Sequence, residues 1–143
     1  MKILKAVCNT LLGIIIVLLL AIAAVLIIPT LTGSKNMAVL SGSMEPEIPV
    51  GSICIVSPIE AEELKIGDVV TYRLSGDTMV THRITQIDSV NQQIVTKGDA
   101  NDAEDGSPVA FENIMGRVKV HIPYLGYISI YAKTPLGIVA ICI

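Results

Sequence analysis

The sequence predicts a mainly β fold, a small antiparallel β-sheet or barrel, behind a single N-terminal transmembrane helix. Two observations lead to this prediction. Residues 11–28 are apolar at 17 of 18 positions. From residue 50 onward, short β-branched runs alternate with turn residues instead. Outside the apolar segment, 57 of 125 residues, about 46%, are apolar, which is an ordinary share for one small globular domain.

Residues 11–28 have the length of a membrane span. Their 18 positions give about 27 Å of helix, close to the roughly 30 Å hydrocarbon core of a bilayer. Pro29 and Gly33 are expected to end the helix. Two lysines, Lys2 and Lys5, precede the segment and one follows closely, so the positive-inside rule puts the N-terminus in the cytoplasm and the rest outside.

A cleaved signal peptide is the competing interpretation of this segment, because Ala21-Ile22-Ala23 resembles a small-residue cleavage motif. The apolar run continues to Ile28, past that motif, and this favours an uncleaved anchor. Residues 136–143 are also apolar, but eight residues cannot span a bilayer, so they are expected to be a buried strand or the start of a second span. The predicted organisation is an N-terminus with a transmembrane helix at 1–34, an extracytoplasmic β-rich domain at 35–134, and an apolar C-terminal segment at 135–143.

Five segments of the remaining chain have the composition of strands, and turn residues separate them. They are Ser52–Ser57, Asp68–Leu74, Met79–Asp88, Gln92–Thr96 and Ile114–Ile122. Ile59–Leu64 is the segment that favours a helix, of about one and a half turns. Strands joined by short turns favour antiparallel pairing.

Charge and cysteine content exclude several classes of function. The net charge is −3 and no Lys/Arg cluster is present, which argues against a nucleic-acid-binding face. Cys8, Cys54 and Cys142 are too widely spaced for a disulfide framework or a zinc site, and Cys54 is expected to fill a strand core. No metal or cofactor is predicted.

Two features carry possible chemistry. The segment Ser41–Pro46 has the composition of a tight loop, and such a loop is either a plain turn or a constrained site for a nucleophile such as Ser43. The strand around His82 places this histidine with apolar neighbours and Arg83 on the opposite, water-facing side, whereas His121 is expected on a polar face. A half-buried imidazole is either a hydrogen-bonded core residue or the base that a serine nucleophile needs.

A third feature is the acidic segment 96–105, which holds four acids in seven residues. It is compatible with a plain surface loop or with a carboxylate that orients a histidine. A calcium loop is disfavoured, because the sixth and twelfth positions from Asp99 are Glu104 and Ala110 instead of glycine and glutamate.

In this order, and behind one N-terminal span, these segments resemble the type I signal peptidases. The resemblance covers roughly residues 38–120 and rests on four motifs: Ser41-Gly42-Ser43-Met44-Glu45-Pro46, Gly67-Asp68-Val69-Val70, Thr81-His82-Arg83-Ile84 and Lys97-Gly98-Asp99-Ala100-Asn101. It implies a β-rich catalytic fold shared with self-cleaving repressors, and Ser43 as the nucleophile.

The resemblance also implies the other members of the site. Many bacterial relatives use a lysine base, but here His82 stands on the corresponding strand, as in the archaeal, endoplasmic-reticulum and spore-former branch. Two acids six positions apart match that branch: Asp105 is assigned as the histidine's partner and Asp99 as a second supporting acid, with the reverse order left open and Asp102 as a weaker third choice.

The oxyanion hole is expected to consist of the Ser43 backbone N–H and the hydroxyl of Ser41, a role carried over from the lysine-type members. A histidine base predicts that activity falls as the pH drops through about 6 to 7.

The expected function is that of a membrane-bound serine endopeptidase, a hydrolase, that releases signal peptides from exported preproteins. Its partners would be preprotein signal peptides and the lipid bilayer. Its location would be the cell membrane, or the endoplasmic-reticulum membrane in a eukaryote, with the catalytic domain on the extracytoplasmic side. Two alternatives stay open: a non-catalytic, membrane-tethered β module that binds extended peptides or a partner protein, and a Ser/Lys dyad that uses Lys97.

Overall fold

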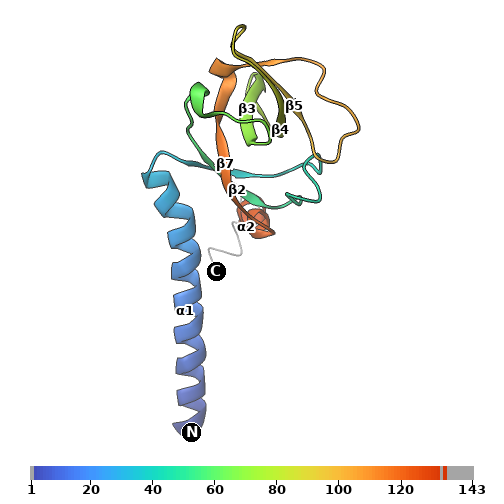
Figure 1. Ribbon diagram of the computed structural model, residues 1–143. Coiled ribbons are helices and arrows are strands. Elements are labelled where there is room, and N and C mark those ends of the chain that lie inside the picture. Colours follow the sequence, from blue (N-terminus) through green and yellow to red (C-terminus); the bar gives the residue numbers. More distant parts are fainter. Residues whose placement is uncertain (1, 133, 135–143) are drawn as a thin grey trace.

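The computed structural model describes residues 2–132 and 134 and has the predicted architecture. A long helix, α1 (Lys2–Leu31), stands apart from a β domain at its C-terminal end, and a short helix, α2 (Leu125–Ala132), lies at the base of that domain (Figure 1). Within the described residues, one antiparallel sheet of seven strands forms, in the order β1-β2-β7-β3-β4-β5-β6. The strands are β1 (Lys35–Ala38), β2 (Ile53–Ser57), β3 (Val69–Ser75), β4 (Thr78–Asp88), β5 (Gln93–Lys97), β6 (Val109–Ala110) and β7 (Ile114–Ile122). The prediction of a mainly β domain behind one apolar helix is confirmed.

Helix α1 contains the whole predicted span and is long and apolar enough to cross a membrane. The prediction that Pro29 ends the helix is wrong, because the helix continues to Leu31. Its end comes at Gly33, whose φ of +84° suits the left-handed conformation, while the N–H of Ser34 donates to the Pro29 carbonyl (3.0 Å). The apolar segment at 135–143 lies outside the described residues.

The five predicted strands correspond to β2, β3, β4, β5 and β7, with ends that agree within one residue. The predicted helix at Ile59–Leu64 is instead a single 3₁₀ turn at Ala61–Glu63. So short a segment cannot offset the cost of helix nucleation, and Leu64 is pulled into the core while the acids stay in solvent. The sequence pattern did not indicate β1, β6 or α2.

The core consists of two clusters of buried side chains. One fills the space beneath β3, β4 and β5 and contains Leu64, Val70, Tyr72, Ile84, Ile94 and Val109. The other lies between β2 and the loop after β1 and contains Met44, Ile48, Cys54 and Val56. The prediction that Cys54 fills a strand core is confirmed, and burial raises the pKa of its thiol to about 11.

The expectation that His121 faces water is wrong, because the residue is half-buried while its neighbour Val120 is exposed. Strand β7 has a bulge at this point: Val118 pairs with Val56 and Val120 with Ile55, which leaves Lys119 without an opposite residue. A bulge shifts the alternation of side chains by one position, so parity counted from the sequence fails beyond it.

Candidate active site

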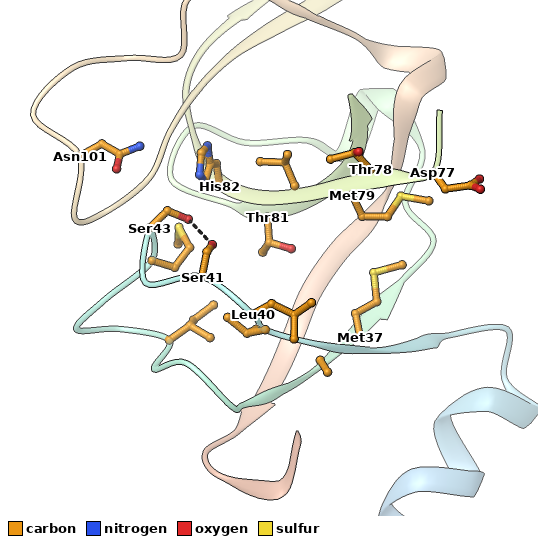
Figure 2. Close-up of a pocket in the computed structure, with 15 residues that line it drawn as sticks. Met37, Leu40, Ser41, Ser43, Asp77, Thr78, Met79, Thr81, His82 and Asn101 are labelled. Carbon is orange, nitrogen blue, oxygen red and sulfur yellow. Dashed lines mark hydrogen bonds between the residues drawn. The ribbon is translucent and has the colours of Figure 1, made fainter. Parts of the chain in front are cut away.

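A cleft of about 640 Å³ lies between the chain that follows β1 and the first half of β4. One wall consists of residues 37–41 with Ser43, Met44 and Ile48, and the other of residues 77–82, with Asn101 at one end. Figure 2 shows Ser43, His82 and Asn101 together at that end, and Met37 and Met79 toward the other. The predicted nucleophile and the predicted base therefore line the same cleft.

Ser43 is held by its backbone and by its neighbour in sequence. The next side chain, Met44, is buried in the core, and the N–H of Ala100 donates to the Ser43 carbonyl (2.9 Å). Gly98 makes this approach possible, because a Cβ there would lie 2.6 Å from the Ser43 carbonyl oxygen. Among the described residues, the hydrogen-bond partner of Ser43 Oγ is Ser41 Oγ, at 3.3 Å (Figure 2).

His82 lies on β4 opposite Val70 of β3 and is 8% exposed. Its Nδ1 is 2.6 Å from Oδ2 of Asp105, in the loop after β5. An ionised carboxylate only accepts hydrogen bonds, so Nδ1 carries the proton and the other ring nitrogen, Nε2, is free to act as a base. This is the tautomer that a serine nucleophile requires.

Asp105 is itself fixed by the strands around it. Its Oδ2 also accepts hydrogen bonds from the Thr96 hydroxyl (2.6 Å) and the Tyr72 hydroxyl (3.2 Å), and its N–H donates to the Thr96 carbonyl (2.8 Å). Burial opposes ionisation of Asp105, but the hydrogen bonds from Thr96, His82 and Tyr72 outweigh it and lower the pKa of this carboxyl from its usual 3.8. Asp105 is therefore a negative charge beside His82 at neutral pH.

Asp99 contacts a different side chain. Its two carboxylate oxygens accept hydrogen bonds from Nε (2.8 Å) and Nη2 (2.6 Å) of Arg83, whose Nη1 donates to the Gly67 carbonyl. Arg83, which was expected to face water, has a side chain that is 34% exposed, and this fork-shaped ion pair covers the rest of it. Asp102, the weaker choice, is exposed in the same loop.

Comparison with protein-family models finds no match. Individual proteins of known function do match the chain. Signal peptidase I W of Bacillus subtilis is 44% identical over 89 residues, which are 60% of this chain and 47% of that protein. The signal peptidase complex catalytic subunit SEC11 of Candida dubliniensis is 35% identical over 109 residues, or 68% of this chain and 64% of that protein. The SEC11C subunit of Rattus norvegicus is 28% identical over 128 residues, or 78% and 67%.

The chain is a homologue of the type I signal peptidases. The relatives that it resembles include a Bacillus signal peptidase and catalytic subunits of the signal peptidase complex. This signal peptidase homologue spans about half of the length of the Bacillus protein and about two thirds of the length of the two SEC11 proteins.

Lys97 is not among the residues that line the cleft. It follows Thr96, whose side chain is fully buried beneath the sheet, and successive side chains of a strand point to opposite faces. Lys97 pairs with Arg83 in the ladder between β4 and β5 and does not line the cleft that contains Ser43.

Two residues of the site were not anticipated from the sequence, Tyr72 and Thr96. Both are buried and share a strand face with a buried apolar residue, Val70 for Tyr72 and Ile94 for Thr96, which is the ordinary position of a core residue. A weak signal existed for Thr96: a buried threonine on a strand leaves a hydroxyl that must find a partner. Nothing in the sequence named Asp105 as that partner.

Proposed function

We propose that this chain is a membrane-bound serine endopeptidase that cleaves signal peptides from exported preproteins through an acyl-enzyme on Ser43. The observation that carries the proposal is the arrangement of three side chains: Ser43 and His82 line one cleft, and Asp105 holds His82 by Nδ1 at 2.6 Å. The similarity to proteins named as signal peptidases supports the substrate class.

The reaction follows from the position of the imidazole. Nε2 of His82 removes the Ser43 proton as Oγ attacks the carbonyl carbon of the scissile peptide bond. The oxyanion that forms is stabilised by the Ser43 N–H and the Ser41 hydroxyl. When the C–N bond breaks, His82 passes the proton to the leaving amine, and the same base then activates water to hydrolyse the ester. Asp105 stabilises the imidazolium in both halves of the reaction.

The reaction starts with a rotation of the Ser43 hydroxyl. In the unliganded cleft Ser43 Oγ contacts Ser41 Oγ, so the hydroxyl must turn from Ser41 toward His82 when a substrate enters. Catalytic hydrogen bonds that are loose in an empty site and tighten on substrate binding are common.

The cleft has the shape for an extended peptide. Strand β5 ends at Lys97, opposite Arg83, so residues 78–82 of β4 extend beyond their pairing with β5. Strand β1, on the opposite wall, is at the edge of the sheet. Two strand edges on either side of a cleft favour a substrate bound as an added strand.

The length of chain between α1 and Ser43 limits how far the cleft can lie from the proposed membrane anchor. Helix α1 ends 12 residues before Ser43, so the nucleophile is within about 43 Å of the helix end even if the chain were fully extended. We propose that residues 1–34 anchor the enzyme with the N-terminus in the cytoplasm. Residues 35–134 then form a catalytic domain on the extracytoplasmic face of the cell membrane, or of the endoplasmic-reticulum membrane in a eukaryote. Substrate signal peptides leave the bilayer at the same level.

Two alternatives are weaker. A non-catalytic peptide-binding module does not need a histidine with a carboxylate at 2.6 Å beside a cleft serine. A Ser/Lys dyad needs Lys97 near Ser43, and Lys97 does not line the cleft.

The test is cleavage of a preprotein by the purified full chain in detergent, with the new N-terminus of the product mapped by mass spectrometry. His82→Ala is expected to lower kcat by about 10³-fold or more, and Lys97→Ala to leave it within a fewfold of the parent. Activity that persists in His82→Ala and disappears in Lys97→Ala would establish the Ser/Lys dyad instead. Absence of cleavage at the signal-peptide junction by the unmodified chain would favour the non-catalytic module.

A further inference from the structure

One oxygen of Asp105 receives three hydrogen bonds. Oδ2 lies 2.6 Å from Nδ1 of His82, 2.6 Å from the Thr96 hydroxyl and 3.2 Å from the Tyr72 hydroxyl, and the two hydroxyls are themselves 3.2 Å apart. Thr96 is fully buried and Tyr72 is 2% exposed. Neither side chain lines the cleft, so neither has access to a bound peptide.

The protons of this cluster can be assigned. A threonine hydroxyl has one proton, and its shorter contact with a charged acceptor is the one to Asp105, so Thr96 donates to the carboxylate. The Tyr72 hydroxyl also donates to Oδ2, and its oxygen stays beside the Thr96 hydroxyl. Both hydroxyls therefore point their protons at the oxygen that His82 uses.

We propose that Thr96 and Tyr72 are positioning residues that keep Asp105 ionised and direct its Oδ2 at Nδ1 of His82. Their catalytic consequence rests on the function proposed above, but the cluster itself does not. Two strands supply these residues, β3 for Tyr72 and β5 for Thr96, and β4 between them carries His82. Side chains of three neighbouring strands therefore hold the loop residue Asp105 by the same oxygen that contacts His82.

The charged groups around Asp105 are few among the described residues. His82 faces it from β4 and Tyr72 from β3, while β5 contributes the neutral Thr96. Of the nearby acids in the same loop, Glu104 accepts hydrogen bonds from the side-chain amide of Gln86. Asp99 is paired with Arg83, as described above. A change at Thr96 or Tyr72 therefore acts on Asp105 and His82 without a further ionisable partner between them.

The direction of the effect follows from charge. Hydrogen bonds from hydroxyls spread the negative charge of the carboxylate, so removing one leaves more charge facing the imidazole and favours its protonated form. The same loss raises the pKa of Asp105, because the hydrogen bond from Thr96 lowers it. The first effect moves the acid limb of the activity profile toward higher pH, whereas the second acts at the more acidic pH where the carboxyl itself titrates.

The direct test is an NMR titration of the histidine rings in the full chain in detergent. The chain has two histidines, and His121→Gln assigns the two signals. Thr96→Val is expected to move the midpoint of the His82 titration upward by about half a pH unit or more and to leave that of His121 in place. Thr96→Ser, which restores a hydroxyl, should return the midpoint to the parent value.

Thr85→Val is the matched control, because Thr85 is a half-buried β4 threonine whose hydroxyl donates to the Val95 carbonyl, away from Asp105. Tyr72→Phe should give a smaller shift than Thr96→Val, since its contact with Oδ2 is longer. A His82 midpoint that is the same in the parent, Thr96→Val and Tyr72→Phe, with all three proteins folded by circular dichroism, would overturn the proposal.

The kinetic test separates this proposal from the proposed function. In preprotein cleavage, Thr96→Val should lower kcat by about 10-fold or more with KM unchanged and should move the acid limb of kcat/KM upward. A lower kcat with the limb in place indicates a merely structural role for Thr96 and contradicts the proposal. If the parent chain cleaves no preprotein, the proposed function fails, and the NMR titration still decides whether the two hydroxyls control Asp105.

Discussion

At the scale of single residues, Asp99 and Asp105 carry the same carboxylate six positions apart and hold different partners. Asp105 contacts the imidazole of His82, whereas Asp99 is engaged by the guanidinium of Arg83. These two contacts fix the loop at both ends, and each acid contacts a different side chain. Asp105 is the acid that can act on the base, and Asp99 holds the loop that contacts Ser43.

The pair offers a matched comparison. Asp105→Asn is expected to lower kcat by about 10³- to 10⁴-fold, because an amide can donate to Nδ1 and so favours the wrong tautomer of His82. Asp99→Asn should cost much less, because Arg83 keeps one good acceptor. The measurement is kcat and KM for preprotein cleavage by each variant. Equal losses in the two variants, or a larger loss in Asp99→Asn, would reverse the assignment.

The lowered pKa of Asp105 also has a consequence for stability. A carboxyl whose pKa is lower in the folded than in the unfolded protein stabilises the fold above its unfolded pKa, and this contribution disappears as the pH falls through the folded value. The free energy of unfolding of the parent should therefore exceed that of Asp105→Asn at about pH 5, and this gap should narrow as the pH falls below about 4. Denaturant unfolding in detergent at a series of pH values measures this gap. A gap that does not change with pH contradicts the ionised carboxylate.

The sequence indicated some of these residues and not others, for a physical reason. Ser43 and His82 were indicated by the four motifs of the resemblance, since by position alone each also had an ordinary interpretation, as a turn serine and a core histidine. Tyr72 and Thr96 were not indicated, because buried residues of these types on strands are common and their hydroxyl partner comes from a loop 9 to 33 positions further along the chain. Contacts across that separation depend on the sheet order, which local patterns do not encode.

At the scale of elements, two loops determine where the nucleophile sits. The loop Ser41–Pro46 carries Ser43, and the loop after β5 donates the Ala100 N–H to its carbonyl. Gly98 lies where a side chain would touch that carbonyl, at 2.6 Å from the nearest possible Cβ. The position of Ser43 relative to His82 thus depends on the absence of a side chain at Gly98 in the neighbouring loop.

Gly98→Ala tests this contact. It should displace the nucleophile and lower kcat by about 10²-fold, since misplacement of a reacting group by 1 Å costs that much. Gly106→Ala, in the same loop with open space around the Cβ position, is the control and should retain the parent's activity. Preprotein cleavage and a thermal melt on each variant separate displacement from unfolding. If Gly98→Ala cleaves like Gly106→Ala, the two loops do not set the position of Ser43.

Element prediction succeeded where a local pattern was strong. The alternation in β4 and the β-branched run in β2 are visible in the sequence itself. Strand β6 has two residues and exists because it pairs with β5, while β1 (KNMA) has no β-branched residue. Helix α2 docks through the Gly126 N–H to the Gly51 carbonyl, at 2.8 Å. These elements are defined by tertiary partners, and a sequence pattern does not reveal the partners.

At the scale of the whole molecule, one long apolar helix and one β-sheet are the two main parts of the structure. Helix α1 buries no residue against the β domain, as expected for a segment whose solvent is lipid, and the sheet lies beyond its C-terminal end (Figure 1). The position of the cleft relative to α1 is set by the short connection from Leu31 to β1, and Asn36 reinforces it by donating to the Leu26 carbonyl (2.7 Å).

The topology can be measured with single cysteines. Val90 is 91% exposed in the turn after β4, so Val90→Cys, with Cys8 and Cys142 changed to serine and the buried Cys54 kept, reports the location of the β domain. A membrane-impermeant maleimide should label it in intact cells, whereas Lys2→Cys in the same background should react only after permeabilisation. Labelling in the opposite order would contradict an extracytoplasmic catalytic domain.

The most direct measurement compares two hydroxyls in the same loop. Preprotein cleavage by the purified full chain should fall by more than about 10⁴-fold in Ser43→Ala, because the nucleophile is lost, and by about 10²- to 10³-fold in Ser41→Ala, because only an oxyanion donor is lost. Both variants should melt at the temperature of the parent chain. A Ser43→Ala variant that still releases the signal peptide at the parent's rate would contradict the assignment of Ser43 as the nucleophile, and with it the proposed acyl-enzyme mechanism.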